Sequence, residues 1–163
     1  EAAKKKTDFG DTYWEGKHLG KLATLSGIAE VIGEEELRTQ FVDEIKSRLE
    51  NWFTASQGEK APLFYYDANW GSLIGSKPSY GSDSQLNDHH FHYGYFLRAA
   101  AEVARFDPAW ARKWGPMVNL LIRDIDSPKK DDALFPYLRC FDIYAGLSWA
   151  LGHAKFGDGN NQE

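Results

Sequence analysis

The chain has 163 residues, of which 42% are hydrophobic, and a formal net charge of −5, which suits one ordinary domain with enough apolar side chains for a core. The negative balance excludes a typical nucleic-acid partner, because phosphate binding needs a clustered positive surface and the main basic cluster is Lys4-Lys5-Lys6. No membrane-spanning segment is expected, because no apolar run approaches the ~20 residues required. The chain has a single cysteine, Cys140, which excludes an internal disulfide.

Two helices are predicted in the first third of the chain. Apolar residues three or four apart between residues 11 and 32, followed by Gly33, predict an amphipathic helix with a glycine stop. A second apolar stripe runs from Glu34 to about Thr54, with three glutamates in the first turn where carboxylates favour the helix dipole. The short connection between them predicts an antiparallel helical hairpin.

Residues 55–86 break the helical pattern. Repeated glycines and prolines predict an ordered loop with one short strand from about Leu63 to Tyr66. A loop longer than about 15 residues in a compact domain is usually functional or disordered. Several tyrosines and Trp70 make this loop too aromatic for disorder, and aromatic rings of this kind suit stacking on sugars.

Helical patterns then resume over residues 88–105, 107–125 and 140–154, with a polar loop at 126–132. The second of these helices has the strongest start, because Asp107 is a favoured cap and Pro108 suits the first helical position. Helical hairpins in series, joined by long aromatic loops, predict an all-α fold and favour an α/α toroid or solenoid over a four-helix bundle.

The stretch from Asn87 to Tyr95, which reads NDHHFHYGY, is the richest in reactive groups. On a helix, Asp88, His92 and Tyr95 share one face. A carboxylate, an imidazole and a phenol suit the wall of a polar pocket, because each polar atom buried in a core needs a partner. The residues alone leave a second interpretation open, in which Asp88 or Asn87 simply caps an ordinary helix.

Other polar clusters also carry two interpretations. Tyr13 and Lys17 are four residues apart and therefore share a helix face. They could form part of a binding site, or the apolar stem of Lys17 could simply pack beside a tyrosine of the core. Asp67 lies close to Trp70 and to glycine residues of the same loop. This combination suits either a sugar subsite or a plain turn. The string from Gly157 to Glu163 has the composition of a loop or a tail.

A metal site is the less favoured interpretation of the histidine-rich stretch. Imidazoles of His89, His90 and His92 with Asp88 are suitable ligands. On a helix, however, His90 points about 100° away from its neighbour, so the three imidazoles do not converge. Ser148 and Cys140 lack the sequence context of a nucleophile. We therefore expect no metal ion and no cofactor.

Five segments in order resemble family 81 of the glycoside hydrolases, the endo-β-1,3-glucanases: residues 13–17, 66–71, 87–95, 139–150 and 158–163. The resemblance covers essentially the whole chain, and the string from Asn87 to Tyr95 is highly specific. Leu147 stands where the family leads us to expect a histidine.

The resemblance implies a fold and an activity. Residues 1–163 would be a partial (α/α)6-barrel catalytic domain, incomplete at both ends. The activity implied is endo-acting hydrolysis of internal β-1,3-glucosidic bonds in laminarin- or curdlan-type glucan, with inversion and without cofactor or metal. The partners implied are the β-1,3-glucan and the remainder of the catalytic domain, and the implied location is extracellular or at the cell wall.

The resemblance also implies site residues. By position, Asp88 matches the general acid and Glu163 the general base, and an inverting pair should lie ~6.5–9.5 Å apart. The glucan-binding residues implied are Tyr13, Lys17, Asp67 and His92, with Asp142 in support. The family has a further glutamate beyond Glu163, so we expect this stretch alone to be inactive. The alternatives are a non-catalytic β-glucan-binding module and, less favoured, a metal-dependent hydrolase.

Overall fold

Helices make up most of the computed structural model, which describes residues 10–139, 141–144 and 146–149. Within these ranges the helices are α1 (Thr12–Ile32), α2 (Glu35–Phe53), α3 (His89–Phe106) and α4 (Pro108–Asp126). The strands are β1 (Leu63–Asp67), β2 (Ser72–Ser76), β3 (Phe141–Asp142) and β4 (Leu147–Ser148). None of the described helices is long and apolar enough to cross a membrane. The prediction of an all-α fold is confirmed in part: the described chain is mostly helical, but it also contains two small sheets.

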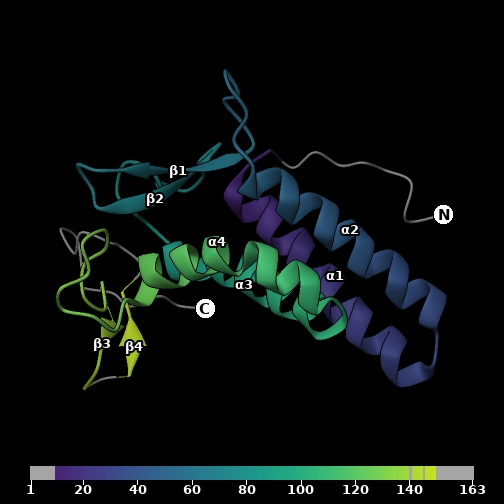
Figure 1. The fold of residues 1–163 in the computed structure, drawn as a ribbon. Coiled ribbons are helices and arrows are strands. Elements are labelled where there is room, and N and C mark those ends of the chain that lie inside the picture. The colour runs from purple at the N-terminus through teal and green to yellow at the C-terminus, as the bar shows by residue number, and fades with distance from the viewer. Residues whose placement is uncertain (1–9, 140, 145, 150–163) are drawn as a thin grey trace.

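The first two helices form the predicted antiparallel hairpin (Figure 1). Helix α1 begins at Asp11, whose carboxylate accepts hydrogen bonds from the backbone N–H groups of Tyr13 (2.9 Å) and Trp14 (3.0 Å). It ends at Gly33, which adopts a left-handed conformation with φ of 78°. A left-handed residue after a helix favours glycine, because a Cβ there would clash with the backbone. Both ends of α1 are therefore determined by local sequence.

The core lies where α3 packs against the other three helices. Leu19 of α1, Ile45 and Leu49 of α2, and Phe96 of α3 are fully buried there. Burying each of these side chains contributes about 1.5–3 kcal/mol relative to exposure. The crossing of α1 and α3 is close, because a Cβ added to Gly20 would lie 2.8 Å from the ring of Tyr95. This crossing brings the start of α1 beside the first turns of α3.

Strands β1 and β2 form an antiparallel hairpin in which Leu63 pairs with Ser76 and Tyr66 with Leu73 (Figure 1). The first strand was predicted, but β2 was not. Its sequence, SLIGS, lacks the alternation of a half-exposed strand because four of its five residues are buried. Both faces of β2 are buried because the strand packs against the helices. Packing between distant elements cannot be read from the local sequence of the strand.

Gly75 of β2 is packed too tightly to accept a side chain. Its added Cβ would overlap the methyl group of Thr12 and lie 3.2 Å from the Phe64 ring. Gly75→Ala should therefore lower the free energy of unfolding by about 1–3 kcal/mol, the usual cost of overpacking a core. Urea denaturation followed by circular dichroism measures this. The control is Gly115→Ala in α4, where the new Cβ meets open space and alanine favours the helix. Equal stability of the two variants would contradict the packing argument.

The predicted helix over residues 140–154 is wrong in its described part, where β3 and β4 pair as an antiparallel hairpin. The carboxylate of Asp142 accepts a hydrogen bond from Tyr144 N–H (2.8 Å), and Gly146 N–H donates to the Asp142 carbonyl (2.8 Å), which closes a turn. Ile143 and Tyr144 are exposed. Most helical stability in proteins comes from packing an apolar face against other elements, and Ile143 and Tyr144 are not packed in this way.

Candidate functional site

Asp88 occupies the position immediately before α3. Its backbone is left-handed, with φ of 56°, and its side chain makes no capping hydrogen bond to the helix. The amide of Asn87 donates to one carboxyl oxygen of Asp88 (2.9 Å) and also to the carbonyl of Tyr80 (2.9 Å). Asp88 therefore stands at the N-cap position of α3, but its carboxyl group does not make the side-chain capping bond of the simpler interpretation. A non-glycine residue in this conformation is uncommon and often occurs at functional sites.

An aromatic cluster forms where the start of α1 meets the first turn of α3. It consists of Tyr13, Lys17, Tyr80, Phe91 and His92, and we call it the Tyr13 cluster. The Tyr13 ring lies 4.9 Å from the Tyr80 ring, 5.8 Å from Phe91 and 5.5 Å from His92. Lys17 donates from Nζ to the Tyr13 hydroxyl (3.3 Å). Three residues predicted to bind glucan are thus brought together, and Asn87 links Asp88 to the same cluster through Tyr80.

His92 is fully buried at the base of this cluster. Its Nδ1 lies 2.9 Å from the hydroxyl of Thr12, 80 residues away in the chain. Its Nε2 has no hydrogen-bond partner among the described residues. Burial, reinforced by the nearby charge of His89, lowers the pKa of His92 to about 4. The imidazole is therefore neutral near pH 7, with one nitrogen as donor and the other as acceptor.

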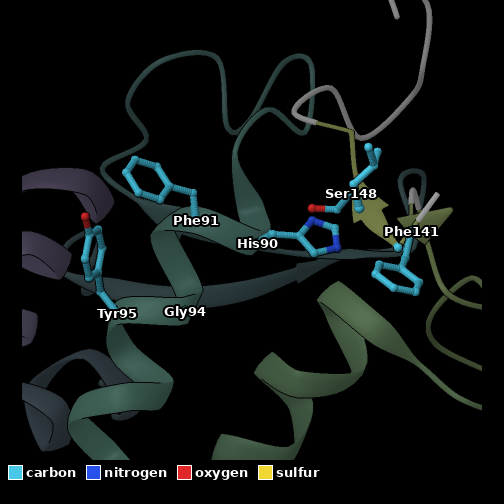
Figure 2. Close-up of a pocket in the computed structure, with 8 residues that line it drawn as sticks. His90, Phe91, Gly94, Tyr95, Phe141 and Ser148 are labelled. Carbon is cyan, nitrogen blue, oxygen red and sulfur yellow. The ribbon is translucent and has the colours of Figure 1, made fainter. Parts of the chain in front are cut away.

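A cavity of about 560 Å³ adjoins the same end of α3 (Figure 2). Figure 2 shows His90, Phe91 and Tyr95 projecting from one helix, with Phe141 and Ser148 of the β3–β4 hairpin across from His90. The full lining is His90, Phe91, Gly94, Tyr95, Phe141, Gly146, Leu147 and Ser148. The volume lies within the range of small-molecule sites. Leu147, where a histidine was expected, is part of this wall.

The two remaining described aspartates of the predicted site lie in turns. Asp67 accepts hydrogen bonds at one carboxyl oxygen from the N–H groups of Asn69 (2.8 Å) and Trp70 (3.2 Å). Asp142 plays the same local role in the β3–β4 hairpin. Trp70 is exposed beside Asp67. The plain-turn geometry predicted as one alternative for Asp67 is therefore present, and its role toward glucan stays a prediction.

Glu163, the predicted general base, lies outside the described residues. The predicted separation of Asp88 and Glu163 therefore stays a prediction. Among the described residues, no group of three histidine, cysteine, aspartate or glutamate side chains is arranged to hold a metal ion.

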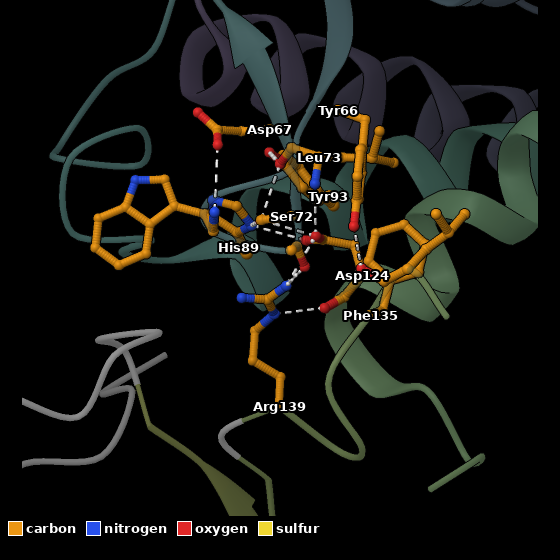
Figure 3. A network of polar contacts seen from close by, with 12 residues as sticks. Tyr66, Asp67, Ser72, Leu73, His89, Tyr93, Asp124, Phe135 and Arg139 are labelled. Atoms are coloured by element: carbon orange, nitrogen blue, oxygen red, sulfur yellow. Dashed lines mark hydrogen bonds and ion pairs between the residues drawn. The ribbon is translucent and has the colours of Figure 1, made fainter. Parts of the chain in front are cut away.

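A buried polar network centred on Asp124 of α4 was not predicted (Figure 3). One carboxyl oxygen of Asp124 lies 2.7 Å from Nδ1 of His89, and the other accepts from the Ser72 hydroxyl (2.9 Å) and from Leu73 N–H (2.8 Å). His89 and Asp124 are 1% and 0% exposed, so no solvent shares these bonds. The network joins α3, α4 and β2 into one unit.

Arg139 completes this network from the segment after α4. Its guanidinium donates to the Asp124 carboxylate (3.1 Å) and to the Gly71 carbonyl (3.0 Å). Burial alone would raise the pKa of Asp124, but the hydrogen bond and charge of His89 and the charge of Arg139 hold it below its usual value. The sequence contained a signal for a buried Asp124. Asp124 stands three residues after Leu121, which is buried, so the two residues share the inner face of α4.

Comparison with known proteins assigns the chain to the glycoside hydrolases, in keeping with a helical frame that carries a carboxyl group beside aromatic rings and a cavity. Residues 1–163 match the glycosyl hydrolase family 81 C-terminal domain, and the chain belongs to this family. The family resemblance predicted from the sequence is confirmed.

Two curated relatives and one solved structure illustrate the match. The chain is 61% identical over 155 residues to a glucan endo-1,3-beta-D-glucosidase of Acetivibrio thermocellus, covering 94% of this chain and 20% of that protein. A protein of the same name from Thermobifida fusca is 51% identical with the same coverage. A solved family 81 structure from Clostridium thermocellum aligns with a TM-score of 0.87 at 60% identity, covering 93% of this chain and 22% of that one. The chain thus spans about a fifth of the length of the relatives it matches.

Proposed function

We propose that the protein hydrolyses internal β-1,3-glucosidic bonds of β-1,3-glucan, and that residues 1–163 form part of an (α/α)6-barrel catalytic domain. The observation that carries this proposal is the match of the whole chain to the family 81 C-terminal domain. The names of the two bacterial relatives, at 61% and 51% identity, give the bond type. Because the chain spans about a fifth of those relatives, the remainder of the catalytic domain is its proposed partner.

In the proposed reaction, Asp88 is the general acid and Glu163 the general base. An inverting hydrolase needs one carboxylic acid to protonate the leaving-group oxygen and one carboxylate to activate water on the opposite face of the sugar. Asp88 suits the first role, because its carboxyl group is held by Asn87 rather than by a helix cap. Two carboxyl groups supply both proton transfers, so the proposal requires no metal ion and no cofactor.

The Tyr13 cluster would bind the glucan next to Asp88. Aromatic rings offer flat apolar faces for sugars, and Lys17 and His92 offer hydrogen bonds to hydroxyl groups. Asp67 and Asp142 are proposed to border the same glucan from the two hairpins. Since a glucan polymer does not cross a membrane, we place the enzyme outside the cell or at the cell wall.

The stereochemistry of the first product tests this proposal. When the complete protein digests laminarin, proton NMR of the fresh products should show the α-anomer first, because single displacement by water inverts a β-linkage. A mixture of oligosaccharide lengths at early times is expected for endo-acting cleavage. Initial release of the β-anomer would contradict inversion.

A non-catalytic β-glucan-binding module is the second candidate, favoured by the exposed Tyr65 and Trp70 on the β1–β2 hairpin. A module would bind laminarin without releasing reducing ends, so the same digest distinguishes the two candidates. Repeating it with EDTA separates a metal-dependent hydrolase, which would lose activity, from the proposed carboxyl pair, which would not.

A further inference from the structure

We propose that Thr12 is a positioning residue for His92: its hydroxyl holds the imidazole in the neutral form that carries the proton on Nε2, ready to donate a hydrogen bond to a glucan hydroxyl. The identity of that acceptor rests on the proposed function. The placement of the proton rests on the contacts of Thr12 alone.

Packing determines the orientation of Thr12. It is fully buried at the start of α1, and its backbone N–H donates to the carbonyl of Lys77 (3.2 Å), just beyond β2. Its methyl group fills the space above Gly75 that a Cβ would otherwise occupy. The backbone hydrogen bond and the contact of the methyl group with Gly75 orient the side chain so that its hydroxyl points to His92. The distance from the Thr12 hydroxyl oxygen to His92 Nδ1 is 2.9 Å.

The hydrogen-bond partners then determine the direction of the Thr12 bond. A buried hydroxyl needs an acceptor, and the Thr12 hydroxyl has two partners among the described residues, His92 Nδ1 at 2.9 Å and Ser79 Oγ at 3.5 Å. The 3.5 Å contact with Ser79 is long for an effective bond between two hydroxyl groups, which usually spans about 2.5–3.0 Å. The Thr12 proton is therefore donated to His92, so Nδ1 is the acceptor and carries no hydrogen.

A neutral imidazole that accepts at Nδ1 has its hydrogen on Nε2. Burial and the neighbouring His89 lower the pKa of His92, and the carboxylate of Asp11 raises it; the first two effects outweigh the third and leave the pKa at about 4. The imidazole ring lies beside the rings of Tyr13, Tyr80 and Phe91, and its Nε2 is buried without a hydrogen-bond partner among the described residues. A buried donor without a partner is costly, and a sugar hydroxyl would supply the missing acceptor.

The first test does not depend on activity. Long-range proton–nitrogen NMR of the ¹⁵N-histidine-labelled complete protein, with His92 assigned by its loss in His92→Gln, should show an unprotonated Nδ1 and a protonated Nε2 at pH 7. The wild-type spectrum decides the matter without any Thr12 variant. A protonated Nδ1 would overturn the proposal.

The second test uses a matched pair of substitutions. Thr12→Val keeps the shape of the side chain and removes the hydroxyl, and should reduce kcat on laminarin by about tenfold, the loss expected for one hydrogen bond. Thr12→Ser restores the hydroxyl and should remain within about threefold of wild type. Thr24→Val is the control on the same helix, because its exposed hydroxyl bonds only to the Gly20 carbonyl in the described contacts.

The outcomes separate this inference from the proposed function. An unchanged kcat in Thr12→Val, or a loss in Thr12→Ser as large as that in Thr12→Val, would overturn the positioning role while leaving the glucanase proposal intact. A wild-type protein without glucanase activity would contradict the proposed function, and the NMR spectrum would still decide the tautomer. If Thr12→Val unfolds, as judged by circular dichroism, the wild-type spectrum and the Thr12→Ser activity remain decisive.

Discussion

Asp88→Asn in the complete protein should reduce turnover of β-1,3-glucan by about 10²–10⁴-fold, the usual contribution of a general acid. Laminarin affinity should remain within a few-fold of wild type, because an amide keeps the size of the carboxyl group and can still accept the bond from Asn87. The reaction would lose its proton donor and keep its binding surface. Reducing-end assays give kcat, and calorimetry at low temperature gives the affinity.

Asp83→Asn is the matched control for this substitution. Asp83 is an exposed carboxylate in the loop that precedes α3, so the same chemical change there should leave turnover unaltered. Equal losses of affinity and rate in Asp88→Asn would point to a binding or structural role for Asp88. Full retention of turnover would remove it from the mechanism.

Asp124→Ala should lower the free energy of unfolding by about 3–5 kcal/mol, the cost of removing one member of a buried ion pair. His89 and Arg139 would then face each other across a space that has lost its negative charge. The Ser72 hydroxyl and Leu73 N–H would also lose their acceptor. Chemical denaturation followed by circular dichroism and tryptophan fluorescence measures the loss.

Ser72→Ala is the control within the same network. It removes the hydroxyl that donates to Asp124 and leaves in place the bonds that His89 and Arg139 make with Asp124, so it should cost only about 1 kcal/mol. Asp124→Asn should fall between the two, because the amide keeps one acceptor oxygen. A loss below about 1 kcal/mol in Asp124→Ala would show that the network does not hold α3, α4 and β2 together.

The Asp124 network also bears on the proposed site. His89 is the first residue of α3 and the neighbour of Asp88, and its Nε2 lies 2.7 Å from the Ser82 carbonyl. The imidazole therefore joins α4 to the loop that leads into Asp88. The histidines of the NDHHFHYGY stretch thus have different roles: His89 belongs to a structural network, His92 to the Tyr13 cluster and His90 to the cavity wall.

Local sequence signals were sufficient to predict the four helices and the family. For α1 the signals are its apolar spacing and Gly33, and for α4 they are Asp107 followed by Pro108. The pairing of Tyr13 with Lys17 was equally readable, because residues four apart on a helix are neighbours. The resemblance to family 81 followed from short strings whose residues lie close together in the chain.

The contacts between distant segments could not be predicted from the sequence and became apparent in the folded chain. Strand β2 is buried by helices that precede and follow it, and the segment after residue 140 forms a hairpin rather than the predicted helix. His89 meets Asp124 across 35 residues, and Thr12 meets His92 across 80. Such pairs leave no periodicity in the sequence, because each depends on the packing of two separate elements. Thr12 meets His92 where α1 crosses α3 at Gly16 and Gly20, and His89 meets Asp124 where α3 packs against α4.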